Sequence, residues 1–241
     1  MLEGVIFDFN GTLFWDSDKN ERAWRIFAKK YTGRDVPGEA FERLHGVPNG
    51  PTIAFLLGRE LPDDEVRALA MEKEAIYYEA CLNDPDGMCL APGAEPMLNE
   101  MKRLAIPCAI ATSADIENVN FYFEHLGLER WFARGRVVYS DGTRRGKPAP
   151  DCFLEAARRL ALAPARLAVV EDSSIGIEAA RAAGVGRLIG IASGSAAKAG
   201  EDVRIIRDFF GWRDWFYSSG FPTGRNAAMR VPSPGQDSAS K

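Results

Sequence analysis

Histidine is scarce in this sequence of 241 residues, where His45 and His125 are the two present. Mechanisms built on a Ser–His–Asp or Cys–His pair therefore have few candidates. The four cysteines are widely spaced and form no CxxC pair, so neither a zinc site nor a redox dithiol is indicated. We expect reduced thiols, and acid–base chemistry carried by carboxylates.

Long apolar runs and long basic runs are also missing. No apolar stretch approaches the roughly 20 residues that span a bilayer, and no basic segment leading into an apolar one opens the chain. The net charge is −4 and no long basic run occurs, which disfavours a nucleic-acid partner. We therefore expect a cytoplasmic protein that binds neither membrane nor nucleic acid. The oligomeric state is left open.

What the chain does contain is an alternation of short apolar runs with helical patterns, at 46% hydrophobic content. Uninterrupted apolar strands of this kind suit a parallel sheet covered on both faces. The pattern predicts an α/β fold with a doubly wound parallel sheet. The expected strands are Gly4–Asp8, Pro107–Thr112, Val137–Tyr139, Leu167–Val170 and Leu188–Ile191. The expected helices are Ala94–Leu104, Ile116–Leu126, Pro150–Leu162 and Ser174–Ala183.

Residues 16–90 break this alternation, because their helical patterns are separated by no strand. The expected helices there are Glu21–Tyr31, Glu39–Leu44, Thr52–Gly58 and Asp64–Leu82. We interpret 16–90 as an inserted all-helical cap, and 1–15 with 91–217 as the Rossmann-like core. Residues 218–241, rich in Ser, Gly, Pro and Asn, are predicted to be a flexible tail.

Ligand sites of open parallel sheets lie beyond the carboxyl ends of the strands. The first expected strand ends in Asp8, which Asn10, Gly11 and Thr12 follow. A carboxylate beside exposed backbone N–H groups can hold a phosphate and attack it. An ordinary Asx turn is an equally good interpretation of this segment alone.

Two further segments offer groups for a phosphate. Thr112 and Ser113 end the second expected strand and supply hydroxyls, although a Thr-Ser pair is often just a helix N-cap. Lys147 lies in Gly-Lys-Pro-Ala-Pro, where two prolines restrict the backbone. A surface lysine is the default interpretation, but a rigidly held one would neutralise phosphate charge.

Adjacent carboxylates, Glu171 and Asp172, follow the buried run Leu167–Val170. Together with Asp8 they would form an oxygen-ligand pocket suited to Mg²⁺. The alternative is that Asp172 caps the next helix while Glu171 forms a surface ion pair.

Asp8, Thr112, Lys147 and Glu171-Asp172 match, in order, the four motifs of the haloacid dehalogenase superfamily, and the chain resembles that superfamily up to about Trp215. It is most similar to the group containing β-phosphoglucomutase and phosphoglycolate phosphatase. The resemblance implies a Mg²⁺-dependent phosphohydrolase that acts on a small phosphorylated metabolite, with a Rossmann-like core and a helical cap.

The resemblance also implies roles for particular residues. Asp8 would form an aspartyl-phosphate that water hydrolyses, while Thr112 and Lys147 would bind the phosphate. Mg²⁺ would be held by Asp8, the Asn10 backbone carbonyl and Asp172, with Glu171 helping directly or through water.

Asn10 departs from the family pattern, which usually has a second Asp two residues after the nucleophile. An amide cannot protonate the leaving group or activate water, and such catalysis is typically worth about 10²–10⁴ in rate. Three alternatives are open: the enzyme turns over slowly, it prefers acyl or aryl phosphates whose leaving groups need little protonation, or another group supplies the proton. A phosphate-binding or regulatory protein with weak turnover is the alternative function.

The cap departs from the mutase pattern too, since Asn20 stands where a histidine is expected and Leu44–Asn49 lacks basic residues. A sugar-phosphate mutase is therefore disfavoured. His45 in that segment is a candidate proton source or specificity residue, with an exposed loop histidine as the ordinary interpretation. A dehalogenase is disfavoured by Glu171-Asp172. A phosphonatase would need a cap lysine, and the candidates Lys19, Lys29, Lys30 and Lys73 lie in no matching motif.

Overall fold

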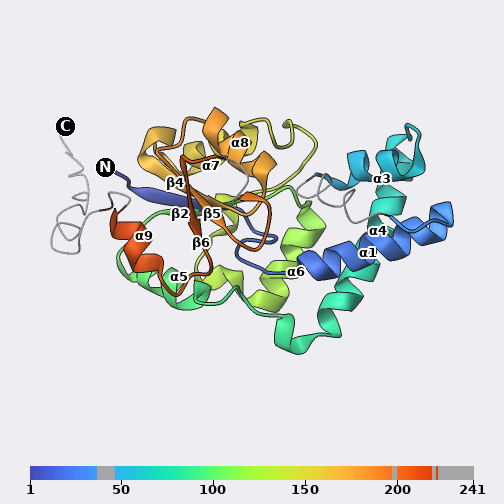
Figure 1. The fold of residues 1–241 in the computed structure, drawn as a ribbon, viewed down its shortest axis with the longest axis horizontal. Coiled ribbons are helices and arrows are strands. Elements are labelled where there is room, and N and C mark those ends of the chain that lie inside the picture. Colours follow the sequence, from blue (N-terminus) through green and yellow to red (C-terminus); the bar gives the residue numbers. More distant parts are fainter. Residues whose placement is uncertain (37–46, 197–199, 219–220, 222–241) are drawn as a thin grey trace, which may run out of the picture.

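A sheet of parallel strands forms the centre of the computed structural model (Figure 1). It has six strands in the order β3-β2-β1-β4-β5-β6. The structure describes residues 1–36, 47–196, 200–218 and 221. The strands are β1 (Gly4–Phe7), β2 (Cys108–Ala111), β3 (Val137–Val138), β4 (Leu167–Glu171), β5 (Arg187–Ile191) and β6 (Val203–Ile206). The helices are α1 (Ser17–Thr32), α3 (Asn49–Leu57), α4 (Asp63–Leu82), α5 (Ala94–Arg103), α6 (Ile116–Leu126), α7 (Asp151–Leu160), α8 (Ser174–Ala182) and α9 (Trp212–Ser218). Short 3₁₀ turns lie at Pro85–Gly87, Leu128–Arg130, Arg134–Arg136 and Pro164–Arg166.

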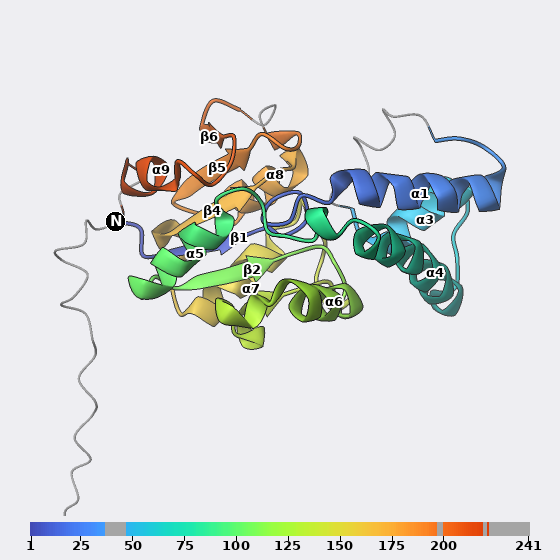
Figure 2. The ribbon, with the colours of Figure 1, turned by 90° about the horizontal axis from the view of Figure 1, so that it is seen from below.

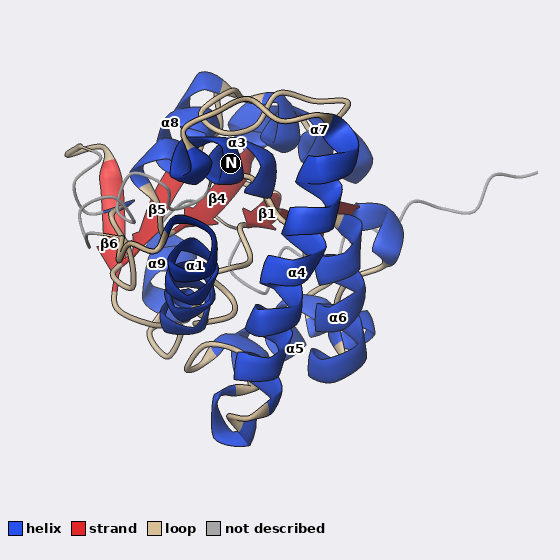
Figure 3. Cartoon of the chain, turned by 90° about the vertical axis from the view of Figure 1, so that its right-hand side faces the viewer, coloured by secondary structure: helices blue, strands red, loops and turns tan. Residues whose placement is uncertain are grey.

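Side chains of the central strand alternate between two hydrophobic clusters. Val5 and Phe7 belong to the cluster that contains residues of α5, α6 and α9, whereas Ile6 belongs to the cluster built by α7 and α8. Figure 3 shows the sheet between these two layers of helices. Burial on both faces explains why the strands have continuous apolar sequences. The predicted doubly wound α/β fold is confirmed.

Helix α7 illustrates how the helices cover the sheet. Its buried residues Phe153, Ala156, Ala157 and Leu160 recur at the helical spacing of three and four. Leu154 and Arg158 are its exposed residues, and the left-handed backbone of Ala161 ends it. The predicted helix Pro150–Leu162 thus forms, but two residues shorter at its carboxyl end, with Pro150 at the N-cap.

Helices α1, α3 and α4 pack on one another beyond the carboxyl ends of the strands (Figures 1 and 2). Trp24, Phe27, Ile53 and Leu69 form their shared hydrophobic cluster. The helix α1 begins at Ser17, four residues before the predicted start at Glu21. The predicted helix Glu39–Leu44, His45 and nearly all of the predicted tail lie outside the described residues.

The strand β6 and the helix α9 were not predicted. β6 pairs with β5 at the edge of the sheet, and its sequence Val-Arg-Ile-Ile exposes two of its four side chains. Such an edge strand lacks the apolar run used to find the others. Helix α9 buries Trp212, Trp215 and Phe216. In the described part of the chain, no helix has both the length and the apolar character that a membrane span requires.

Candidate active site

The site lies where the order of strands reverses, between the neighbouring central strands β1 and β4. Asp8 follows β1 directly, and its backbone N–H donates to the Val170 carbonyl of β4 at 2.9 Å. Three carboxylates therefore meet at one point: Asp8 follows β1, Glu171 is the last residue of β4, and Asp172 follows it. Oxygen atoms of these three side chains lie within 4.8 Å of one another, and all three residues are buried.

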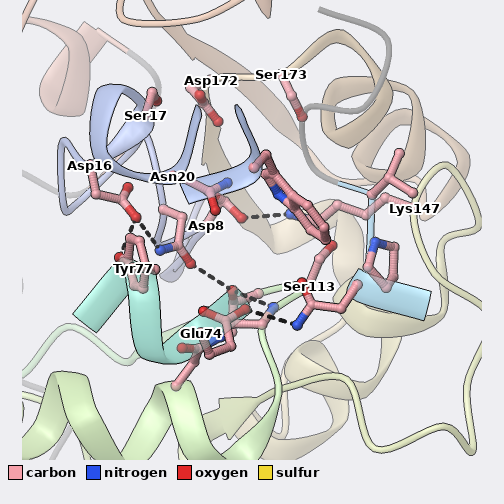
Figure 4. Close-up of a pocket in the computed structure, with 18 of the residues that line it drawn as sticks. Asp8, Asp16, Ser17, Asn20, Glu74, Tyr77, Ser113, Lys147, Asp172 and Ser173 are labelled. Atoms are coloured by element: carbon pink, nitrogen blue, oxygen red, sulfur yellow. Dashed lines mark hydrogen bonds and ion pairs between the residues drawn. The ribbon is translucent and has the colours of Figure 1, made fainter. Parts of the chain in front are cut away.

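Lys147 joins two of these carboxylates. Its ammonium donates to Asp8 Oδ1 and to Glu171 Oε2, both at 2.7 Å, and the lysine is buried. Figure 4 shows Lys147 and Asp8 in the pocket. Burial by itself would lower the pKa of Lys147, but the two carboxylates outweigh it and raise that pKa. The lysine thus stays charged, and the interpretation as a surface lysine is wrong.

The carboxylates repel one another despite Lys147. Burial, and then the charge of Glu171, raise the pKa of Asp8 to about 7. Burial and the charges of Glu171 and Asp8 raise the pKa of Asp172 well above its ordinary value. Burial would raise the pKa of Glu171 as well, but Lys147 lowers it. Three buried acids against one lysine leave an excess of negative charge that a divalent cation would neutralise.

Local structure holds Glu171 and Asp172 in place. Glu171 Oε1 accepts from the Ser173 backbone N–H at 3.0 Å and from its hydroxyl at 2.7 Å. The Ser173 hydroxyl also accepts from Gly176 N–H and so caps α8. The alternative in which Asp172 caps this helix is therefore wrong, as is a surface ion pair for Glu171.

Gly11 allows the Asp172 carboxylate to lie close to the backbone of the loop after β1. Its φ is +75°, a region that favours glycine, and a Cβ there would lie 2.2 Å from Asp172 Oδ2. Its N–H donates to Phe14 O and Asp16 Oδ1, while the Thr12 N–H donates to Phe9 O at 3.2 Å. Neither Gly11 nor Thr12 lines the pocket, and these N–H groups bond within the loop. Their predicted contact with substrate stays a prediction.

Thr112 and Ser113 both line the pocket beside Asp8, Lys147 and the acidic pair. The Thr112 backbone N–H bonds to β3 through Val138 O at 2.9 Å, which ties the strand end to the sheet. Asp115, whose carboxylate accepts from Asn118 N–H, is the N-cap of α6. The ordinary interpretation of Thr112-Ser113 as that helix's N-cap is therefore wrong.

Asn10 is held by residues that sequence reasoning missed. Its amide nitrogen donates to Asp16 Oδ2 and to the Tyr122 hydroxyl, both at 2.7 Å. Asp16 Oδ2 also accepts from the Tyr77 hydroxyl at 2.5 Å. Because both amide hydrogens are occupied in this way, the side-chain oxygen Oδ1 of Asn10 lies toward Thr112, whose hydroxyl donates to it at 3.4 Å. Burial raises the pKa of Asp16 above its ordinary value.

The helices α1 and α4 also contribute polar side chains to the pocket, among them Asn20, Lys73 and Glu74. Of the four lysines considered for a phosphonatase, Lys73 alone appears in this lining. Its ammonium is paired with Glu74 at 3.0 Å. A Schiff base needs a neutral amine, so this ion pair disfavours that chemistry.

The haloacid dehalogenase-like hydrolase family matches residues 2–184 of the chain. Among curated proteins, the fructose-1-phosphate phosphatase YqaB of Escherichia coli strain K12 is 30% identical over 184 residues, 76% of this chain and 93% of that protein. Hexitol phosphatase A of the same strain is 31% identical over 183 residues, 76% of this chain and 80% of that protein.

Among solved structures, a HAD hydrolase of family IA, variant 3, from Entamoeba histolytica superposes with a TM-score of 0.75 at 32% identity, covering 86% of this chain and 94% of that one. A β-phosphoglucomutase from Clostridium difficile gives the same TM-score at 23% identity, covering 90% of this chain and 98% of that one. This second likeness shows a shared fold. The predicted superfamily and the predicted kind of enzyme, a phosphatase of that superfamily, are confirmed. With most of its length matched by the family and its fold shared with solved members, this chain belongs to the haloacid dehalogenase-like hydrolases.

Proposed function

We propose that the protein is a Mg²⁺-dependent phosphatase that acts on a small phosphorylated metabolite through an aspartyl-phosphate on Asp8. The observation that carries this proposal is the buried contact of Lys147 with both Asp8 and Glu171, beside Asp172. A nucleophile, a fixed positive charge and an oxygen-ligand set meet there at one pocket. The names of the curated relatives extend the proposal to phosphorylated sugars.

In the proposed first step, a carboxylate oxygen of Asp8 forms a bond to phosphorus while the bond to the leaving oxygen breaks, and that oxygen takes a proton from solvent. Lys147 and Thr112 offset the charge of the phosphoryl oxygens. In the second step, water attacks phosphorus and gives up one proton to solvent, the bond to Asp8 breaks, and inorganic phosphate leaves. Asp8, Asp172 and the backbone carbonyl of Asn10 would hold Mg²⁺, with Glu171 helping directly or through water, and the ion would supply charge neutralisation.

The proposal also assigns the chain to a catalytic core and a cap. Residues 1–15 and 91–217 would be the catalytic core and 16–90 the cap, because α1 and α4 contribute side chains to the same pocket as Asp8. A cap over the strand ends would exclude water and set specificity. A cytoplasmic location belongs to the proposal.

Phosphate release from p-nitrophenyl phosphate, with and without Mg²⁺, tests this function. We expect release to require Mg²⁺, and Asp8→Asn to lose at least about a thousandfold in kcat, because covalent catalysis then has no nucleophile. The exposed control Asp18→Asn should retain wild-type rates. Turnover that persists undiminished in Asp8→Asn would overturn the proposal.

A second function, phosphate binding with weak turnover, is favoured by Asn10. Its amide hydrogens are held by Asp16 and Tyr122, so this side chain offers an acceptor and no proton. Aryl and acyl phosphates have good leaving groups that need no proton. A phosphatase should therefore hydrolyse them, whereas a binding protein should not. Binding of aryl and acyl phosphates without release of either product would favour the binding protein.

A further inference from the structure

The pocket has a second polar region, built entirely by the helices α1, α3 and α4. Asn20 and Trp24 come from α1, Asn49 from the first residue of α3, and Lys73 with Glu74 from α4. We call these five residues the helical subsite; Figure 4 labels Asn20 and Glu74. The exposed fractions of Lys73 and Glu74 are 3% and 4%, which is unusual for charged residues.

Hydrogen bonds fix the two charged side chains of the helical subsite. The Lys73 ammonium donates to Asn20 Oδ1 at 2.7 Å and to Glu74 Oε1 at 3.0 Å. Asn49 donates to the same Glu74 oxygen at 2.8 Å. The ammonium also lies 4.8 Å from the centre of the Trp24 ring. Lys73 is thus neutralised within the subsite, and its charge is not free for a substrate anion.

The other oxygen of Glu74 is different. Oε2 is buried, and within the described residues no donor bonds to it. An ionised oxygen left without a donor in a buried place is costly, which makes it a strong acceptor for any hydroxyl that enters. The carboxylate lines the same pocket as Asp8, so the arriving hydroxyl would belong to the molecule whose phosphate is at Asp8.

We propose that the helical subsite selects phosphate monoesters whose leaving group is neutral and carries hydroxyls, and that Glu74 Oε2 accepts a hydrogen bond from one of them. This inference rests on the proposed phosphatase function and names the substrate class of that site. A second phosphate is disfavoured, because Lys73, the cation of the helical subsite, is already paired with Glu74. This agrees with the absence of basic residues from Leu44–Asn49.

The experiment compares Glu74→Gln with wild type on fructose 1-phosphate, fructose 1,6-bisphosphate and p-nitrophenyl phosphate in saturating Mg²⁺. We expect kcat/KM for the monophosphate to fall about ten- to a hundredfold more than for the aryl ester, since a bond to a charged acceptor is weakened. The ratio of bisphosphate to monophosphate activity should rise, because Lys73 then has no carboxylate partner and its charge becomes available to a second phosphate.

Glu79→Gln is the matched control, because Glu79 is exposed on the same helix and lies outside the pocket lining. Asn49→Ala gives a second route: it removes a donor that orients Glu74, and it should show the same selective loss if Glu74→Gln does not fold. Equal losses on the monophosphate and the aryl ester in both variants would overturn the inference while leaving the phosphatase intact. If wild type itself shows no turnover of the aryl ester that depends on Mg²⁺ and Asp8, the proposed function is overturned instead.

Discussion

At the scale of single residues, Asn10 is the informative departure from the family pattern, and its surroundings explain how an amide is accommodated. Asp16 and Tyr122 accept its two hydrogens at 2.7 Å, and Tyr77 donates to the same oxygen of Asp16. A carboxylate at position 10 would have no hydrogen for Asp16 and would face a buried negative charge. The amide therefore suits this loop electrostatically, whatever it removes from catalysis.

This network predicts the outcome of Asn10→Asp. We expect the single variant to be less stable by about 1–3 kcal/mol, because two buried acceptors then face each other. The double variant Asn10→Asp/Asp16→Asn should regain part of this loss, since it restores a donor. Thermal melts and ethyl phosphate hydrolysis check both, with the double variant expected to turn over alkyl esters faster. A single variant as stable as wild type would contradict the electrostatic account.

The cysteines give a second prediction at this scale. Burial raises the pKa of Cys81 and of Cys108 to about 12, and that of Cys152 to about 11. Cys89 is exposed. Because the thiolate is the reactive form, iodoacetamide at pH 8 should label Cys89 in the folded protein and spare the other three. Peptide mass mapping, with a urea-unfolded sample as the control, would disagree if all four were labelled at similar rates.

At the scale of elements, the helices α1, α3 and α4 share a hydrophobic cluster separate from those of the sheet. Phe27 is fully buried in it. Phe27→Ala should destabilise the chain by about 3–5 kcal/mol, since removing a buried aromatic leaves a cavity. Hydrogen exchange should accelerate first in these three helices and less in β1 and β4, because the lost contacts lie in the helical cluster.

Phe55→Ala is the matched control for this prediction. Phe55 lies in α3 but is 60% exposed, so its removal should change stability by less than about 0.5 kcal/mol. Exchange that accelerates equally in the sheet and the helices after Phe27→Ala would mean that the two parts unfold together.

The elements also show how far the sequence predicts this fold. The strands β1 to β5 were predictable because each contains an apolar run that is buried on both faces. The approach of Asp8, Glu171 and Asp172 to one another was predictable because the strand ends of a parallel sheet converge. β6 was missed because its exposed edge interrupts the apolar pattern. The contacts of Tyr77 with Asp16 and of Tyr122 with Asn10 were missed, because they span 61 and 112 residues of chain and leave no local pattern.

At the scale of the whole molecule, the fold concentrates negative charge at one buried point. Asp8, Glu171 and Asp172 approach one another because β1 and β4 are neighbours, and Lys147 balances one of the three charges. The raised pKa values of Asp8, about 7, and of Asp172 are the consequence. A carboxyl whose folded pKa is raised stabilises the fold at low pH, and that contribution is lost as pH rises through the folded pKa. The metal-free protein should therefore be less stable at pH 8 than at pH 5.5.

Magnesium should reverse this trend, because a cation bound by deprotonated carboxylates stabilises the folded state most where protons compete least. At about a hundred times its Kd, Mg²⁺ would add about 2.7 kcal/mol. We expect the Mg²⁺-dependent rise in Tm to be larger at pH 8 than at pH 5.5, and EDTA to abolish it. Asp172→Asn should remove most of the rise and, because one repelling charge is gone, should itself melt higher than metal-free wild type at pH 8. A magnesium effect of equal size in Asp172→Asn and wild type would place the metal elsewhere, and the three carboxylates would then need another explanation.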